Sequence, residues 1–300
     1  MRNSILAATE EAWHVPNIPL ADWVDTAVNW LRSSLGLLWD FIAFVVNHCV
    51  DFLIEVLTFL PPWGMFLILT VIAFFVRGWA MALFTLIAFG LIDSMNYFHE
   101  TMQTLAQVIF AAVVALLIAI PLGVLAATNN TVSKSVKPLM DFMQTLPVFV
   151  YLIPVVFFFS IVGTVSGIVA TVLFSLPPGV RLTELGIRQV DPEMVEAGEA
   201  FGTPKSRILS GIQIPLAMPS IMAGINQVIM LGLSMQVIAG LVGAPGLGDE
   251  VIEAVSRVEI GQGFTSGISV VFLAIFLDRI TSSLGDLTAV GRAQKVAAKA

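Results

Sequence analysis

Long stretches of this chain carry no charged side chain, and residues 102–127 are the clearest example. A helix needs about 20 apolar residues to cross the hydrocarbon core of a membrane, so such stretches favour lipid around the chain. Of the 300 residues, 57% are hydrophobic and 12% are charged, whereas a soluble domain carries about 25% charged residues. The sequence therefore indicates an integral membrane protein partnered by the lipid bilayer. It excludes a soluble enzyme, a nucleic-acid-binding module and a disordered scaffold.

The fold class we expect is all-α, a polytopic membrane protein with about seven spans. Residues 164–178 are short for a span, so we expect this segment to be tilted, flanked or partly re-entrant. Pro177-Pro178 is expected to end it, because proline removes a backbone donor and kinks a helix. The other prolines within spans, Pro121, Pro147 and Pro154, are ordinary kinks or bends that shape a gated path. The expected spans are 57–76, 79–95, 102–127, 139–160, 164–178, 216–243 and 266–285.

The first 56 residues form a separate segment in this interpretation. Polar side chains recur within residues 28–56 at a spacing that keeps them on one face of a helix. This pattern favours an amphipathic helix at the membrane interface, with a first transmembrane span as the alternative. No cleavable signal peptide is evident, because the acidic first 26 residues lack a basic start followed by an apolar run. The polar residues are Arg32, Asp40, Asn47, His48, Asp51 and Glu55, and the interfacial tryptophans are Trp13, Trp23, Trp30 and Trp39.

Lysine and arginine gather in alternate loops, which predicts that those loops face the cytoplasm. With seven spans, the C-terminus is then cytoplasmic and the N-terminus lies outside. The chain divides into an N-terminal segment 1–56, two peripheral spans in 57–95, a core 96–290 and a cytoplasmic tail 291–300. The basic loops carry Arg77, Lys134, Lys137, Arg181, Arg188, Lys205 and Arg207, with Arg292, Lys295 and Lys299 in the tail. The opposite loops carry Asp51, Glu55, Asp93, Glu100, Asp249, Glu250, Glu253 and Glu259, with one base, Arg257.

The longest cytoplasmic loop, residues 179–215, is expected to contain two short helices, because residues typical of helix caps mark their ends. Asp191 is a good N-cap and Pro192 suits the first helical position, so we expect a helix over 193–201. Gly202 is able to adopt the left-handed conformation that ends a helix. Thr203 and Pro204 are expected to start the second helix in the same way, and Pro215 to close the segment. Such a rigid helix pair is suited to transmitting a push or pull from a partner.

The same loop resembles the EAA loop of ATP-binding-cassette importer permeases. The matching residues are Glu196-Ala197-Gly198, Gly202 after three intervening residues, Ile212 after nine more, and Ile214-Pro215 after one more. The family pattern has Ala in place of Gly198 and Leu in place of Ile214, and both changes are mild. The segments 143–154, 176–190, 215–248 and 273–281 are similar to permeases for glycine betaine and proline betaine, and the similarity runs from about residue 100 to 285.

This resemblance implies a type I importer transmembrane domain in the cytoplasmic membrane of a prokaryote. Two permease copies would form the pathway, and an extracytoplasmic binding protein would deliver the solute. A cytoplasmic ATPase dimer would receive the EAA loop. By the same resemblance, the residues that couple to the ATPase are Glu196, Ala197, Gly198, Gly202 and Pro215.

The chain lacks chemistry of its own for driving a pump. It has no phosphate-binding loop of the form G-x-x-x-x-G-K-[ST], so ATP and Mg²⁺ are expected on the partner ATPase and no cofactor or catalytic residue in this chain. His14, His48 and His99 share no metal-ligand spacing. Ion coupling would leave ionisable groups in mid-membrane. The nearest candidates, Asp141, Glu184, Asp278 and Arg279, are expected near span ends.

The sequence evidence for residues that line the substrate path is weaker than that for the coupling loop. Asn226, Met230 and Ser234 follow one another at helical spacing in the sixth span. They form either a weakly polar lining or helix–helix contacts, in which Ser and Asn join neighbouring helices. Gln144 and Tyr151 are further lining candidates. A cation–π cage for a quaternary ammonium group is expected in the separate binding protein.

Two alternatives remain open at this stage. The same architecture would serve an importer of choline, carnitine or an amino acid. An ion-coupled secondary transporter or channel is the alternative of another class. A structural scaffold without transport is disfavoured by the specifically spaced cytoplasmic loop.

Overall fold

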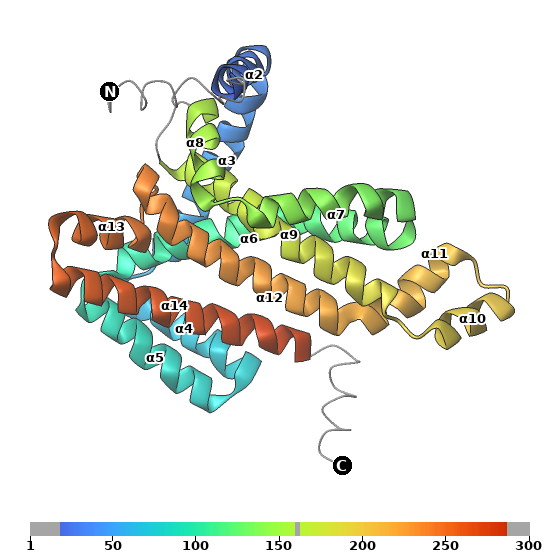
Figure 1. Ribbon diagram of the computed structural model, residues 1–300. Helices are drawn as coiled ribbons and strands as arrows, with labels where there is room; N and C mark the ends of the chain where they lie inside the picture. Colours follow the sequence, from blue (N-terminus) through green and yellow to red (C-terminus); the bar gives the residue numbers. More distant parts are fainter. Residues whose placement is uncertain (1–18, 160–162, 287–300) are drawn as a thin grey trace, which may run out of the picture. The chain divides into compact units, whose positions relative to one another are not determined.

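Every element of the computed structural model is a helix, over the residues that the structure describes, 19–159 and 163–286 (Figure 1). The expected all-α fold is thus confirmed. By its internal contacts the chain divides into two compact units, which meet at Phe41 and Ile42 and are described separately. Trp13 and the tail 291–300 lie outside the described residues.

The N-terminal unit contains α2 (Leu20–Ser34) and the beginning of α3 (Gly36–Thr58). Helix α2 buries none of its residues and exposes Trp23 and Trp30. It carries the polar and aromatic pattern typical of an interfacial helix. Helix α3 is long and apolar enough to cross a membrane. The single interfacial helix expected over 28–56 is therefore divided at Leu35, and its second part fits the alternative of a span by length and composition.

Two short apolar helices follow, α4 (Pro62–Arg77) and α5 (Trp79–Ser94). Gly78 joins them at φ +86°, a conformation that favours glycine. Each has 16 residues, so each is about 24 Å long, less than the hydrocarbon core of about 30 Å. Aromatic side chains pack α5 against α14 (Ile260–Asp286), with ring centroids 5.3 Å apart for Phe89 and Phe276.

Three long helices form the centre of the second unit, and small residues let them approach closely. A Cβ atom added at Gly179 of α9 would lie 2.8 Å from Ala119 of α6 and 2.9 Å from Val228 of α12. A Cβ atom added at Gly123 of α6 would lie 2.6 Å from the Cβ of Thr183 of α9. Small interface residues are typical of helix packing in membranes. The three helices are α6 (Phe98–Thr128), α9 (Thr164–Arg188) and α12 (Ile214–Ala239).

Helix α9 corrects one expectation, because it does not end at Pro177-Pro178. It continues to Arg188, so this span is not short. Both prolines are buried, and α9 is the most enclosed of the candidate spans. Neighbouring helices hold the chain helical there despite the missing backbone donors, as is common for proline inside membrane helices.

The expected span over 139–160 is sharply bent near Pro147, one of the prolines expected to kink or bend a span. The structure has α7 (Asn130–Thr145) and α8 (Val148–Phe159), bent by 97° at a short break. Leu146 at the break is extended, with φ −70° and ψ 135°, as the residue before a proline prefers. Asn129 caps α7 by accepting a hydrogen bond from the backbone N–H of Thr131 at 2.9 Å. Helix α7 therefore begins before the expected span, and its first turns are polar.

The remaining elements lie at the two ends of α12 (Figure 1). At one end are α10 (Pro192–Ala200), α11 (Lys205–Ile208) and the π-helical turn η1 (Leu209–Gln213). At the other end are the 3₁₀ turn η2 (Gly240–Val242) and α13 (Leu247–Arg257).

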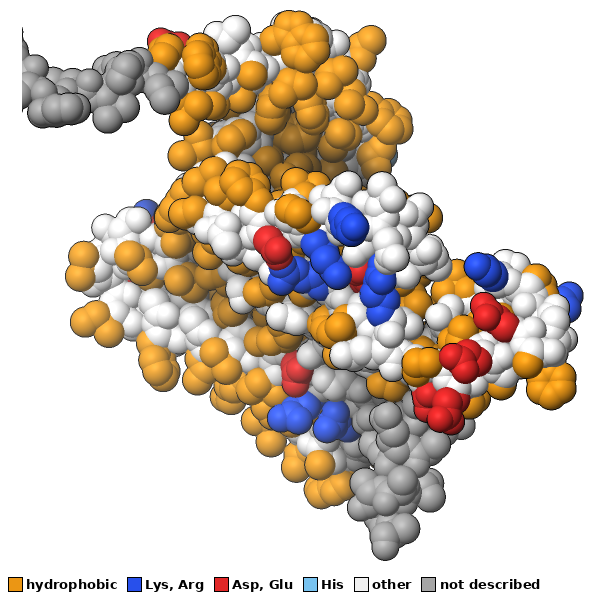
Figure 2. Space-filling view, turned by 45° about the vertical axis from the view of Figure 1, so that its right-hand side comes forward, with side chains coloured by type: hydrophobic (Ala, Val, Ile, Leu, Met, Phe, Trp, Pro, Cys, Tyr) orange, Lys and Arg blue, Asp and Glu red, His pale blue; other side chains and the backbone are white. Residues whose placement is uncertain are grey.

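Five of the described helices are long and apolar enough to span a membrane, or six if the bent pair α7–α8 counts as one span. They are α3, α6, α9, the rod of residues 205–242 and α14. The shorter α4 and α5 fall below that length. Figure 2 shows large hydrophobic side chains over much of the visible surface, and many large hydrophobic residues are exposed. Such a surface suits lipid.

Candidate functional site

Helix α10 is capped at both ends, as expected from its sequence. Asp191 accepts a hydrogen bond from the backbone N–H of Glu193 at 2.9 Å, and Pro192 holds the first helical position. Gly202 has φ +71°. Its N–H donates to Glu199 O, and the N–H of Thr203 donates to Gly198 O at 3.1 Å, the paired bonds of a Schellman ending. These caps make α10 a rigid unit.

The outer face of α10 is open. Phe201 is 88% exposed and Met194 is 49% exposed, and Ala197 is also exposed. Glu196 is exposed as well, but on the side of the helix that lines the pocket described below. Phe201 follows directly after α10 at the edge of the same face. Large exposed apolar residues beside acidic ones mark a surface suited to a protein partner.

Gly198 differs from its neighbours, because it faces the chain itself. An added Cβ would lie 3.1 Å from Ile212 and 3.3 Å from Ile208. Gly198 is buried, as is Ile208. In this structure the small residue therefore permits close packing of α10 on α11 and η1, rather than offering a free surface.

The second half of the expected loop is part of a span. Helices α11, η1, α12 and η2 form one continuous rod over residues 205–242, so Pro215 does not close the segment as expected. The backbone N–H of Ile214 bonds to Leu209 O across the π turn. This wider turn directly precedes Pro215, which has no N–H to give to the preceding turn. Thr203 does not cap α11, whose cap position is Pro204.

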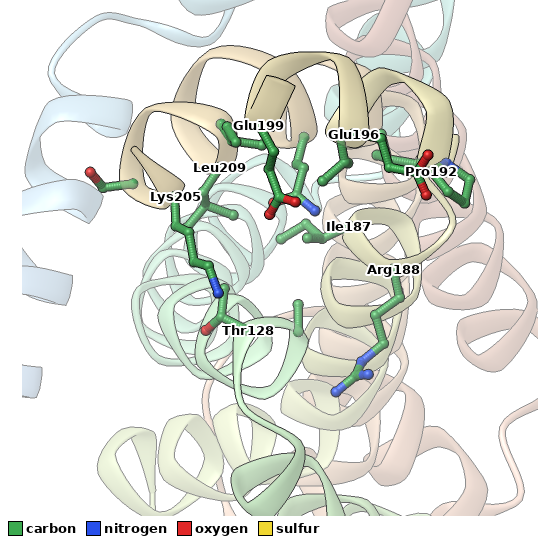
Figure 3. A pocket seen from close by; sticks show the side chains of 14 residues that line it. Thr128, Ile187, Arg188, Pro192, Glu196, Glu199, Lys205 and Leu209 are labelled. Atoms are coloured by element: carbon green, nitrogen blue, oxygen red, sulfur yellow. The ribbon is translucent and has the colours of Figure 1, made fainter. Parts of the chain in front are cut away.

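A pocket of about 690 Å³, the inner pocket, lies between α10 and the rod (Figure 3). Glu196 and Glu199 line it from α10, and Lys205 lines it from α11. Arg188, at the end of α9, lines it from below, and its guanidinium points away from α10 (Figure 3). The remaining lining residues are Ala127, Thr128, Ile187, Val190, Pro192, Val195, Ser206, Ile208, Leu209 and Gln213.

We call α10 and α11 together the arm. A buried carboxylate joins the end of α9, from which the arm extends, to the neighbouring helices. The side chain of Glu184 is 4% exposed and lies 2.8 Å from Arg188 Nε. Ser133 Oγ of α7 donates to Glu184 Oε1 at 2.7 Å, and Arg188 donates to Ala126 O of α6 at 2.7 Å. Three helices thus meet at one ion pair where α9 turns into α10. The i,i+4 spacing of Glu184 and Arg188 is the sequence signal for this pair.

The expected path residues are not gathered into one site by the contacts present. Asn226 Nδ2 donates to Asp278 Oδ1 of α14 at 3.0 Å, which is a helix–helix contact. Ser234 Oγ donates to Met230 O on its own helix at 3.0 Å. Gln144 is exposed near the end of α7, and Tyr151 is buried with its ring centroid 6.4 Å from that of Phe174. Solute contact by these residues stays a prediction.

Sequence reasoning missed a buried amide network at the other end of α12. Gln236 Nε2 donates to Gln107 Oε1, and Gln107 Nε2 donates to Pro245 O at 2.7 Å. Thr171 Oγ1 donates to Gln236 Oε1 at 3.1 Å. No local sequence pattern predicts this network, because its members come from α6, α9, α12 and the loop after η2. Among the described residues, no group of three or more His, Cys, Asp or Glu is placed to hold a metal ion.

Comparison with known proteins gives the arrangement a context. Residues 119–288 match the family described as binding-protein-dependent transport system inner membrane component. The glycine betaine transport system permease protein OpuAB of Bacillus subtilis (strain 168) is 45% identical over 270 residues, or 90% of this chain and 95% of that protein. The glycine betaine/proline betaine transport system permease protein ProW of Escherichia coli (strain K12) is 37% identical over 275 residues, or 92% of this chain and 77% of that protein.

Solved structures share the fold. An inward-facing form of the MetNI methionine ABC transporter superposes with a TM-score of 0.55 and 22% identity, over 66% of this chain and 95% of that chain. An amino acid ABC transporter superposes with a TM-score of 0.52 and 17% identity, over 67% of this chain and 97% of that chain. The expected type of transmembrane domain is therefore confirmed at the level of the fold.

Proposed function

The chain belongs to the inner-membrane components of binding-protein-dependent transport systems, the permeases of ABC importers, and from this premise we propose that it imports glycine betaine and proline betaine. The supporting observation is its 45% identity, over 90% of its length, to a permease named for glycine betaine. A member of this family is a multi-pass protein of the bacterial inner membrane. It is a transport subunit rather than an enzyme, and it works with an ATPase and a substrate-binding protein.

Energy enters this permease through α10 in our proposal. The helix is capped at both ends, its outer face is open, and it is packed through Gly198 onto a rod that runs unbroken into α12. A push on Glu196, Ala197 or Phe201 would therefore move α12 as a lever. The ion pair of Glu184 and Arg188 would pass the same movement to α6 and α7.

Two further components complete the proposed assembly. ATP and Mg²⁺ are bound by a dimer of the partner ATPase, because the chain itself has no G-x-x-x-x-G-K-[ST] loop. A second copy of the permease closes the path, which fits the many large hydrophobic residues exposed on the single chain. Glu196, Ala197 and Gly202 would contact the ATPase, while Gly198 would support them from behind.

The orientation is also a proposal. We place α10, the basic loops and the C-terminus in the cytoplasm, following the distribution of lysine and arginine. The side on which the N-terminus lies depends on α3, because one more crossing would reverse it. Cys49, the only cysteine, is exposed near the middle of α3. If α3 spans, Cys49 lies in lipid, where its thiol stays protonated and unreactive, so neither a membrane-permeant nor an impermeant maleimide labels it until the membrane is dissolved. Equal labelling by both reagents would instead place α3 at the interface and the N-terminus outside.

Uptake by the reconstituted system tests the proposed function. The permease, its ATPase and its binding protein are placed in liposomes with ATP inside, and labelled glycine betaine is added outside. We expect uptake that requires ATP and that unlabelled proline betaine competes with. Preference for choline, carnitine or an amino acid would contradict the proposed substrate. Uptake by the permease alone under an ion gradient would contradict the proposed mechanism.

A further inference from the structure

A second cavity, of about 270 Å³, lies between α7 and α9 and is separate from the inner pocket except for Arg188. We call it the α7–α9 cavity. Figure 2 shows basic and acidic side chains gathered on one face, near the α10–α11 arm, within a largely uncharged surface. The cavity is lined by Lys137, Asp141, Arg181, Glu184, Leu185 and Arg188.

The charges around the α7–α9 cavity are paired across the two helices. Lys137 Nζ of α7 lies 3.4 Å from Glu184 Oε1 of α9. Arg181 of α9 forms an ion pair with Asp141 of α7. The side chains of Lys137, Asp141 and Arg181 are 56%, 57% and 42% exposed. A ligand in the cavity is therefore able to reach these groups although they are paired.

Pairing alone does not account for these charges. Half-exposed ion pairs contribute only about 0–1 kcal/mol to stability, whereas ionisable groups in a membrane-spanning segment are costly and face a water-filled space or the interior of the bundle. Arg181 lies seven residues before the end of α9 at Arg188, or about 10 Å along the helix. A charged, open cavity at that depth is therefore a hydrated place for a polar solute.

The signs of the charges select the chemistry of that solute. Three cations and two carboxylates surround the cavity, so a phosphate group would be attracted by Lys137 and Arg181 but repelled by Asp141 and Glu184. A small zwitterion satisfies both signs, because its carboxylate pairs with arginine and its cation faces a carboxylate. Leu185, 46% exposed, adds an apolar wall for a methylated ammonium group.

We propose that the α7–α9 cavity is a weak binding site for the transported zwitterion at the inner end of the path, with Arg181 as the carboxylate ligand and Asp141 facing the ammonium group. This inference rests on the proposed function. The solute exchanges with the Arg181–Asp141 pair, so the site holds it without trapping it. Because Glu184 also joins the cavity to Arg188 at the base of α10, occupancy and the position of the coupling arm are linked.

Protection of a single cysteine tests the site. In a Cys49→Ala background, Leu185→Cys places a thiol in the cavity wall, and Val255→Cys on α13, at a residue that is 69% exposed, serves as the exposed control. The intact permease–ATPase complex in nanodiscs is labelled with an impermeant maleimide. We expect saturating glycine betaine to slow labelling at 185 by at least about fivefold and to leave labelling at 255 unchanged. Choline has the ammonium group without the carboxylate, so it should not protect.

Two variants assign the ligand. Arg181→Gln should abolish protection, whereas Arg181→Lys should retain part of it, because lysine keeps the charge but not the bidentate geometry. Protection by choline or inorganic phosphate equal to that by betaine would overturn the proposal. So would a thiol at 185 that cannot be labelled without ligand, or protection that survives Arg181→Gln. If the Leu185→Cys protein imports betaine with ATP yet shows no protection, the cavity site fails and the proposed function stands.

Discussion

The two ends of α12 differ in how tightly they are packed. Following the proposed orientation, we call the end next to α13 the outer end and the end next to α10 the inner end. At the outer end, between α12 and α13, the backbones touch: a Cβ added at Gly248 would lie 2.7 Å from Val237 O and 2.8 Å from Gln236 O. At the inner end, a Cβ added at Gly211 or Gly202 would meet nothing within 4 Å. The outer end is packed so tightly that it resists change. The inner arm is rigid within itself but open around its outer face.

The difference in packing suggests that the outer end of α12 serves the stability of the fold and the inner end serves coupling to the ATPase. A close-packed end fixes one conformation, because packed interiors transmit strain rather than absorb it. The open arm makes few contacts with the rest of the chain, so a partner that binds it is able to move it. Substitutions at the outer end should therefore act on folding, and substitutions on the arm should act on transport, which is a contrast that experiments are able to break.

The largest expected effect is on stability at the outer end. Gly248→Ala should lower the free energy of unfolding by about 3 kcal/mol, because the nearest neighbours of the new methyl group are backbone atoms that cannot rotate away. The matched change Gly211→Ala, at the inner end, should be neutral or stabilising. Thermal unfolding of the purified proteins measures both. Equal losses at the two positions would remove the contrast.

The next effect concerns coupling. Glu196→Arg should reduce ATP-driven uptake by at least about tenfold, equivalent to about 1.4 kcal/mol, because it reverses an exposed charge on the helix proposed to meet the ATPase. The melting temperature should not change. The control is the same reversal at the exposed outer residue Glu259, which should leave ATPase coupling intact. Retained uptake in Glu196→Arg would be evidence against the proposed contact.

A smaller effect is expected in the buried amide network. Gln236→Leu should cost about 1 kcal/mol, the usual size of a hydrogen bond between membrane helices, because Gln107 Oε1 loses its donor. The double change with Gln107→Leu should cost less than the sum of the two single changes. Additive losses would mean that the two amides act independently. Unfolding of the single and double variants provides the comparison.

The smallest effect depends on pH. Partial burial, followed by the nearby charge of Glu253, raises the pKa of Asp249 in α13. The folded protein then binds this proton more tightly than the unfolded chain, so the contribution to stability is present below about pH 4 and is lost as pH rises through the raised value. Asp249→Asn should unfold at a slightly higher temperature than the parent at pH 7. A gain that grows as pH falls would show the opposite sign.

Local signals were sufficient for the coupling helix. Asp191, Pro192 and Gly202 act on their own backbone neighbours, so their sequence positions predict where α10 begins and ends. The resemblance of the loop to a known pattern supplied the expected partner. The all-α membrane fold followed from the apolar segments alone.

Expectations that depend on distant neighbours were less reliable. Pro177-Pro178 does not end a helix, because α6 and α12 enclose it, whereas the chain does break at Leu146 and Pro147, where α7 is polar and less enclosed. Pro215 lies in a continuous rod because a π turn precedes it. Gln107 and Gln236 are 129 residues apart, and Gly198 packs against Ile208 and Ile212 of a different helix. Such contacts exist only after folding.

The most direct test of coupling through α10 is to identify what this helix contacts in the intact transporter. A photo-crosslinking amino acid replaces Phe201, which is 88% exposed on the inner arm, or Val255, which is 69% exposed on α13. After illumination of the complex of permease, ATPase and binding protein, adducts are identified by mass spectrometry. We expect an ATPase adduct from position 201 and none from position 255. No ATPase adduct from position 201, or an equal one from both positions, would contradict coupling through α10.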